Sequence, residues 1–171
     1  MPAGSLTVYC IDTSILIDFH RHYPRDIFGV WDNLEVLIAE DRAIAPKQVR
    51  DELKAWDDWL AKWAAKQKTM FKPLLAKHAK CASEIIAHSP ALAHAERRTE
   101  SADPFVIGLA LAEKRTSLLG SDYVVVTSES RTKGGRIPNA CGHFGVGCLS
   151  LFEFMKAEGW SFVQGPHPTT Q

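Results

Sequence analysis

The stretch Leu6-Thr-Val-Tyr-Cys-Ile11 is the first apolar run of the chain, and it ends abruptly at Asp12. Its apolar, partly β-branched side chains predict a buried strand. Apolar residues at helical spacing follow from Thr13 and predict a short helix that ends before Pro24. A buried strand, an acid and a helix in this order are typical of one βα unit of an α/β protein.

The alternation of strands and helices continues along the chain. Apolar, β-branched runs predict further strands at 43–45, 123–127 and 145–148. Between them, apolar residues three and four positions apart predict amphipathic helices. Those helices begin at Asp26, Lys47, Phe71, Asp103 and Leu149. Residues 128–139 combine Ser, Thr, Gly-Gly and Pro, which favours a loop.

Two of these expected helices are long. The one from Lys47 places apolar residues at helical spacing as far as Trp63, and the one from Phe71 ends near Pro90. Strands that alternate with helices imply crossover connections and a mainly parallel sheet covered on both faces. The predicted fold is therefore a three-layer α/β/α arrangement with a short, mainly parallel central sheet.

Length and composition set further limits. A chain of 171 residues with 46% hydrophobic residues suits one domain, over residues 1–171, with its own core. Its apolar runs are shorter than the about 18–20 residues of a membrane span, and residues 1–5 do not resemble a signal peptide. We therefore expect a cytoplasmic protein that does not span a membrane.

The cysteines and charges agree with a reducing compartment but identify no partner by themselves. Four irregularly spaced cysteines favour free thiols over a disulfide framework. They are Cys10, Cys81, Cys141 and Cys148. The 20 basic and 20 acidic residues balance, although residues 1–61 are mainly acidic and residues 62–98 mainly basic. This pattern fits a carboxylate site beside a surface for a polyanion, or an ordinary solvated helical surface.

Four acids follow the ends of predicted strands. Asp12 directly follows the first strand, and Glu52 lies one turn into the helix after the second. Asp103 starts a buried helix, and Glu129 lies two residues beyond the most clearly predicted strand. In a parallel sheet all four project from one edge, where ligands bind. Because clustered carboxylates repel one another, we expect a hard cation among them, Mg²⁺ or Mn²⁺ rather than zinc.

Each acid except Asp12 also has a ready structural interpretation. Asp103 can cap the helix that follows it, Asp51 competes with Glu52 for any role, and Glu129 fits an ordinary loop. Their joint position at successive strand ends is what favours a site.

Four stretches carry these acids: Tyr9-Cys-Ile-Asp-Thr-Ser-Ile-Leu-Ile-Asp18, Ala45-Pro-Lys-Gln-Val-Arg-Asp-Glu-Leu53, Ala102-Asp-Pro-Phe-Val-Ile-Gly-Leu-Ala110 and Val124-Val-Val-Thr-Ser-Glu129. They resemble the four motifs of the PIN-domain family, metal-dependent nucleases that include the VapC-type toxins. Many members carry Asp rather than Glu as the fourth acid. The resemblance runs from about residue 7 to residue 163.

The resemblance implies a PIN-like domain in which the four acids hold one or two divalent ions. Cleavage would be of RNA phosphodiesters, leaving a 5′-phosphate and a 3′-hydroxyl. Ser14 matches the family's hydroxyl position, where it bonds an acidic ligand or contacts phosphate; a helix N-cap is its structural alternative. The resemblance also implies a homodimer and, for toxin members, an antitoxin partner. A helical insertion at about 54–100 makes the chain similar to a long, poorly characterised PIN-like subfamily.

Basic residues in the loop after the fourth acid are the candidates for binding RNA. Arg131, Lys133 and Arg136 can reach phosphates from that loop, or they belong to an exposed, solvated loop. In the basic middle, lysines alternate with Trp63 and Phe71, a pattern that allows base stacking.

Two tryptophans of that region favour a different interpretation, because Trp56 and Trp63 lie on the apolar stripe of the expected helix. Such a stripe is typical of a core or a dimer interface.

Three other functions compete with this interpretation. Structural zinc at Cys141, His143 and Cys148 lacks the CxxC pair typical of such sites. A haloacid-dehalogenase-type phosphatase needs a second Asp where Ser14 stands. A catalytically silent PIN-like module that binds RNA or protein stays open as the alternative to an enzyme.

Overall fold

The computed structural model describes residues 6–56, 58–93 and 101–161. In these ranges the chain folds around a five-stranded sheet with the order β3-β2-β1-β4-β5, and every neighbouring pair is parallel. The strands are β1 (Thr7–Ile11), β2 (Ala43–Pro46), β3 (Phe71–Lys72), β4 (Asp122–Val126) and β5 (Gly147–Leu149). The predicted α/β class with a parallel central sheet is confirmed.

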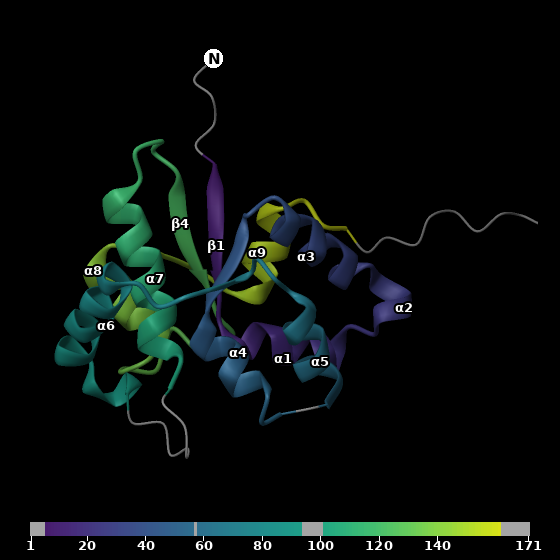
Figure 1. The fold of residues 1–171 in the computed structure, drawn as a ribbon, viewed down its shortest axis with the longest axis horizontal. Coiled ribbons are helices and arrows are strands. Elements are labelled where there is room, and N and C mark those ends of the chain that lie inside the picture. The colour runs from purple at the N-terminus through teal and green to yellow at the C-terminus, as the bar shows by residue number, and fades with distance from the viewer. Residues whose placement is uncertain (1–5, 57, 94–100, 162–171) are drawn as a thin grey trace, which may run out of the picture.

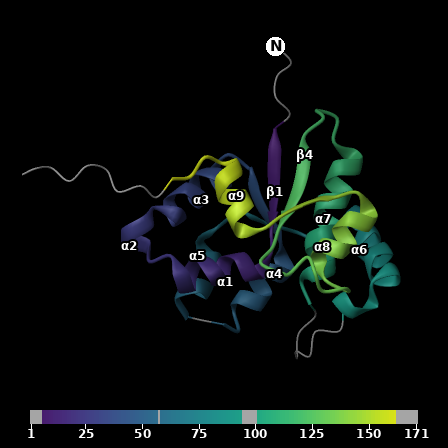
Figure 2. The ribbon, with the colours of Figure 1, turned by 180° about the vertical axis from the view of Figure 1, so that it is seen from behind.

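Helices cover both faces of this sheet. They are α1 (Thr13–His22), α2 (Arg25–Phe28), α3 (Val30–Ala39), α4 (Lys47–Leu53), α5 (Asp58–Lys66), α6 (Ala76–His88), the 3₁₀ turn η1 (Pro90–Leu92), α7 (Asp103–Thr116), α8 (Ile137–Phe144) and α9 (Leu151–Ala157). Helices α6 and α7 lie on one side of β1 and β4, and α1, α3 and α9 lie on the other (Figures 1 and 2). The three layers follow from crossover connections between parallel strands.

The order of the strands reverses between β1 and β4. From β1 the chain continues to β2 on one side, and from β4 it continues to β5 on the other. Ile11 pairs with Val126, and the N–H of Asp12 donates to the Val126 carbonyl at 3.0 Å. The segments that leave these two strands therefore begin side by side, at the point where such sheets open a crevice for ligands.

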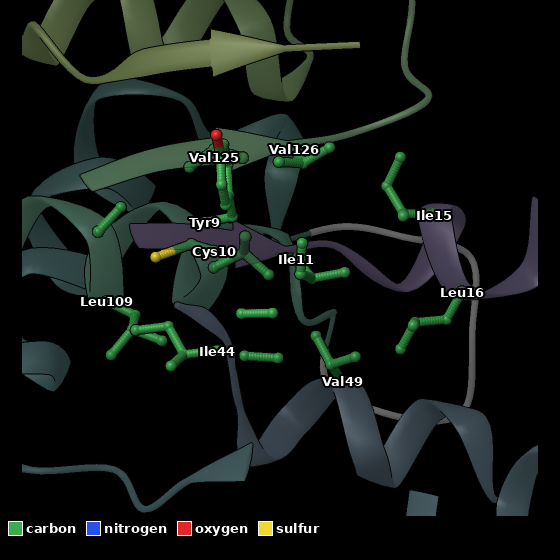
Figure 3. Close-up of a cluster of buried hydrophobic side chains, with 14 of the residues drawn as sticks. Tyr9, Cys10, Ile11, Ile15, Leu16, Ile44, Val49, Leu109, Val125 and Val126 are labelled. Carbon is green, nitrogen blue, oxygen red and sulfur yellow. The ribbon is translucent and has the colours of Figure 1, made fainter. Parts of the chain in front are cut away.

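The core fixes the position of β1. Cys10 and Ile11 are fully buried, and apolar side chains from the neighbouring strands and from α1, α4 and α7 surround them (Figure 3). The labelled neighbours are Ile15, Leu16, Ile44, Val49, Leu109, Val125 and Val126. Because β1 is held from both faces, Asp12 is held where the apolar core ends.

Gly108 allows α6 and α7 to pack closely. A Cβ at this position would lie 2.9 Å from the Ala82 backbone nitrogen and 3.1 Å from the His78 carbonyl oxygen. Real Cβ atoms almost never come within 3.0 Å of backbone, so only glycine fits here without a shift of α6. The close contact fixes α7, which carries Asp103 at its first position.

Two expected helices are interrupted. The helix expected from Asp26 is instead α2 and α3, separated by Gly29, whose φ of 58° is left-handed and ends the helical path. The helix expected to reach Trp63 is instead α4 and α5. Helix α4 ends in tight i→i+3 bonds, in which Ala55 N–H donates to the Glu52 carbonyl and Trp56 N–H to the Leu53 carbonyl.

Other departures depend on tertiary contacts. Phe71 is in β3, not in a helix, because it pairs with Ala45 as an edge residue of the sheet. Helix α8 begins at Ile137, inside the region expected to be a loop. In α9, helical spacing alone does not separate Phe152 from Phe154, but Phe152 is 72% exposed while Phe154 is buried.

The region expected to be a helical insertion supplies α5, β3, α6 and η1 in its described part, so it also contributes an edge strand. Trp63 is buried and its indole N–H donates to Glu35 at 3.0 Å, as a core interpretation requires, whereas Trp56 is 40% exposed. Phe71 is also buried, so the aromatic residues that alternate with lysines are not an exposed stacking surface. All four cysteines are free, and among the described helices none is long and apolar enough to cross a membrane.

Candidate functional site

The four acids predicted from the sequence line one cavity of about 190 Å³. Its lining residues follow the carboxyl ends of β1 and β4 and belong to α1, α4 and the start of α7. Figure 1 shows α1 and α4 side by side at this end of β1. Its lining consists of Asp12, Thr13, Ser14, Ile17, Glu52, Ser101, Asp103, Glu129 and Arg136. The four carboxylates thus line the same cavity, as expected from the ends of parallel strands.

Asp12 is the buried centre of the site and is 3% exposed. Its Oδ2 accepts hydrogen bonds from the Ser14 hydroxyl at 2.5 Å and the Thr127 hydroxyl at 2.9 Å. Its Oδ1 accepts from the Thr13 N–H at 2.8 Å, so Asp12 also caps α1. Burial raises the pKa of Asp12 to about 6, and the charges of Glu129 and Glu52 act in the same direction, against the two hydroxyl bonds.

Ser14 holds Asp12 and does not cap the helix, because Asp12 itself has that role. While donating to Asp12, the Ser14 Oγ accepts a hydrogen bond of 3.0 Å from the Ser128 N–H. It therefore ties the segment after β4 to the start of α1. Of the roles predicted for Ser14, contact with an acidic residue is present, and contact with phosphate stays a prediction.

Glu52 is 8% exposed and joins three parts of the chain. Its Oε2 accepts from the Thr13 hydroxyl at 2.5 Å, and its Oε1 accepts from the Ala102 N–H at 3.0 Å. Asp51, which competed with it in the sequence, forms surface ion pairs with Lys47 and Lys54. Glu52 is therefore the acid of this helix that belongs to the cavity.

Asp103 is the acid with the most strongly shifted pKa. Burial is the largest cause, and together with the nearby charges of Asp12, Glu129 and Glu52 it raises the pKa of Asp103 to about 8, against a hydrogen bond with Ser101 that lowers it. The predicted capping role is wrong: α7 begins at Asp103 itself, and no side chain caps it. The carboxylate of Asp103 therefore serves the cavity and not the helix end.

Glu129 is placed differently from the other three acids. Its Oε1 accepts from the Arg136 guanidinium at 3.1 Å, and its Oε2 accepts from the Ile137 N–H at 2.8 Å. Ile137 is the first residue of α8, so Glu129 satisfies an orphan donor of that helix. Both of its oxygens are thus engaged at the rim of the cavity.

The three basic residues predicted to bind substrate lie apart from one another. Arg136 lines the cavity beside Glu129. Arg131 instead pairs with Glu153 at 2.5 Å and lines a neighbouring cavity of about 210 Å³. Lys133 is exposed and lines neither cavity.

Sequence reasoning missed three hydroxyl residues of the site, namely Thr13, Ser101 and Thr127. Thr127 is 1% exposed although it is polar. The sequence signal for Thr127 was a polar residue directly after the buried strand residues Val-Val-Val, because a buried polar group needs a hydrogen-bond partner.

The donor set suits a hard divalent cation, because it consists of carboxylate and hydroxyl oxygens. The raised pKa values of Asp12 and Asp103 show that negative charge is costly in this cavity, and a bound cation would offset that cost. Within the described ranges, however, no three His, Cys, Asp or Glu side chains are arranged to hold a metal ion as they stand.

That absence extends, within the same ranges, to the zinc site weighed at Cys141, His143 and Cys148. Instead, the His143 ring stacks on His88 at 3.4 Å, and Cys141 is buried.

Comparison with known proteins gives a family without an assigned activity. No curated protein matches the sequence. A family described as a domain of unknown function (DUF4411) matches residues 9–162, a span that contains all four acids and most of the described fold. The chain therefore belongs to the DUF4411 family of domains of unknown function.

Proposed function

We propose that this protein is a metal-dependent nuclease that hydrolyses RNA phosphodiesters with Mg²⁺ or Mn²⁺. One observation carries the proposal: four carboxylates from separate elements line one cavity at the switch point of a parallel sheet. The PIN-like motifs in the sequence support the same reaction.

Each residue has a distinct part in the proposal. Asp12, Glu52 and Asp103 hold the cation, and Glu129 reaches it through water or after leaving Arg136. Ser14 keeps Asp12 oriented. When bound, the cation would activate water, orient the phosphodiester and stabilise the leaving oxygen.

Arg136 is the substrate-binding residue that the cavity supports best. It contacts Glu129 through one guanidinium nitrogen, and its side chain is 50% exposed, so it keeps donors for a phosphate at the rim. Arg131 and Lys133 act only on RNA that extends beyond the cavity.

Cleavage of a labelled single-stranded RNA with Mn²⁺, Mg²⁺ or EDTA tests the proposal. We expect cleavage only with a divalent ion, and a loss of at least about 100-fold in Asp12→Asn. Asp51→Asn is the matched control, because Asp51 lies beside Glu52 in sequence but on the exposed surface. No metal-dependent cleavage by the wild-type protein, or equal cleavage by folded Asp12→Asn, would refute the nuclease.

A catalytically silent binding module is the second candidate, and the engagement of Glu129 favours it. With both Glu129 oxygens bonded to α8 and Arg136, the site is left with three acids for a cation. Measurable RNA affinity without cleavage under any metal condition would support this candidate.

The partners and setting of the nuclease are part of the proposal. They comprise RNA, a second copy of the chain in a homodimer, and an antitoxin if the protein is the toxin of a type II toxin–antitoxin pair, all in the cytoplasm. Light scattering measures the dimer. Co-purification with the product of a neighbouring reading frame for a small DNA-binding protein tests the toxin role.

A further inference from the structure

Two arginines lie over two tryptophans at one end of the molecule. The Arg21 guanidinium carbon lies 4.5 Å from the centroid of Trp56, and that of Arg25 lies 4.3 Å from the centroid of Trp59. The His20 ring stacks on Trp59 at 5.3 Å with an interplanar angle of 8°. We call these five residues the arginine–tryptophan patch.

The patch continues two walls of the acidic cavity. Ile17 lines the cavity from α1, and Arg21 lies four residues further along the same face of that helix. Glu52 lines it from α4, and Trp56 follows four residues later in the turn that ends α4. Arg21 lies over Trp56, so the continuations of α1 and α4 beyond the cavity meet. The meeting point lies about one helical turn from the cavity.

Helix α5 extends this surface. Trp59 belongs to α5 and packs edge-on against the buried Trp31, with ring centroids 5.1 Å apart. Figures 1 and 2 show α1, α4 and α5 together at the same end of the molecule. The ring below Arg25 is thus held by the core.

The two arginines of the patch are accessible to solvent. Arg21 and Arg25 are exposed, and each lies over an indole ring. Four other arginines instead contact carboxylates: Arg42, Arg115, Arg131 and Arg136. Because both patch arginines are exposed, their N–H groups can reach an anion from outside.

Resting on the proposed nuclease function, we infer that the arginine–tryptophan patch binds the nucleotides of single-stranded RNA that flank the phosphodiester in the acidic cavity. Guanidinium N–H groups pair with phosphates, and the planar faces of guanidinium and aromatic groups stack with unpaired bases. Such binding tolerates many sequences because every base has a face to stack. The cations also offset the repulsion that RNA meets at the acidic cavity.

Fluorescence anisotropy with a labelled 12-nucleotide single-stranded RNA in EDTA measures binding without cleavage. We expect Arg21→Gln/Arg25→Gln to bind about tenfold more weakly at 0.1 M salt and to reduce the salt slope by about 1.4. Lys80→Gln is the matched control, because Lys80 is exposed on α6, on the other side of the sheet. Wild-type affinity in the double variant would overturn the inference.

Two further measurements distinguish a failure of the patch inference from a failure of the nuclease proposal and from a folding defect. If the wild-type protein cleaves no RNA but the double variant still binds more weakly, the nuclease fails and the patch stands. If cleavage occurs and the KM for a long RNA is the same in the double variant, the patch fails and the nuclease stands. Arg21→Lys, which keeps the charge without the planar group, guards against a folding defect: intermediate affinity supports the patch, and wild-type affinity contradicts the stacking.

Discussion

The Oε1 atom of Glu52 accepts a hydrogen bond of 3.0 Å from the backbone N–H of Ala102, the residue directly before Asp103. This bond joins α4 to the start of α7 across the acidic cavity. Thr13 closes the other side by donating to Oε2 of the same carboxylate. Glu52 therefore positions two neighbouring acids whether or not a cation is present.

The first prediction concerns the charge of Glu52. In Glu52→Gln the side-chain amide oxygen can still accept the hydrogen bond from Ala102, so this variant should fold but bind Mn²⁺ at least about tenfold more weakly. Isothermal titration with Mn²⁺ measures the difference, with Asp51→Asn as the exposed control. Equal weakening in both variants would contradict a specific role for Glu52.

The second prediction concerns pH and stability. The pKa of Asp103 is raised to about 8 in the folded protein, whereas an unfolded Asp has a pKa of about 4. Between these values the folded state keeps a proton that the unfolded chain has lost. The contribution of Asp103 to the free energy of unfolding is therefore fully present below about pH 4 and is lost as the pH rises through about 8.

Replacing the Asp103 carboxyl group should remove this pH dependence of the free energy of unfolding. Without a divalent ion, we expect Asp103→Asn to have a flatter pH profile and to be more stable than wild type at pH 8 by roughly 1–3 kcal/mol. Urea unfolding between pH 5 and pH 8 in EDTA measures both curves. A wild-type free energy of unfolding that rises over this range would show that the carboxylates are not clustered as described.

The third prediction concerns Ser14 as a positioning residue. Its hydroxyl bond favours the charged form of Asp12, so Ser14→Ala should raise the pKa of Asp12 further. If the nuclease proposal holds, the acidic limb of the pH–rate profile moves to higher pH, and the rate near pH 6 falls about tenfold. Ser14→Thr, which keeps the hydroxyl, should restore part of the rate. A uniform fall at every pH would point to general loss of structure.

The fourth prediction concerns Gly108. A methyl group there meets the backbone of α6, so Gly108→Ala should lower the free energy of unfolding by about 1–3 kcal/mol. Gly142 is a matched control, because it also lies within a helix but has open space around it. Thermal unfolding of Gly142→Ala should show no loss of stability. Equal behaviour of the two variants would mean that α6 and α7 are further apart.

The sequence predicted the fold and the acids for local reasons. A fully apolar run such as β1 is stable only when both faces are covered, and strands alternating with helices connect most simply in parallel. The parallel direction then brings Asp12, Glu52, Asp103 and Glu129 to one edge of the sheet. Element boundaries were less predictable, because Phe71 becomes a strand residue only by pairing with Ala45.

What the sequence determined by itself is thus the order of strands and helices and the residues at the strand ends, since both follow from side-chain periodicity and chain direction. What only the tertiary structure decided is how those residues are used. Glu129 bonds to Arg136 and α8, Asp103 lines the cavity without capping α7, and Arg21 lies over Trp56. Hydrogen bonds and ring contacts of this kind depend on distances of a few ångströms between segments remote in sequence, and those distances are fixed only when the core packs.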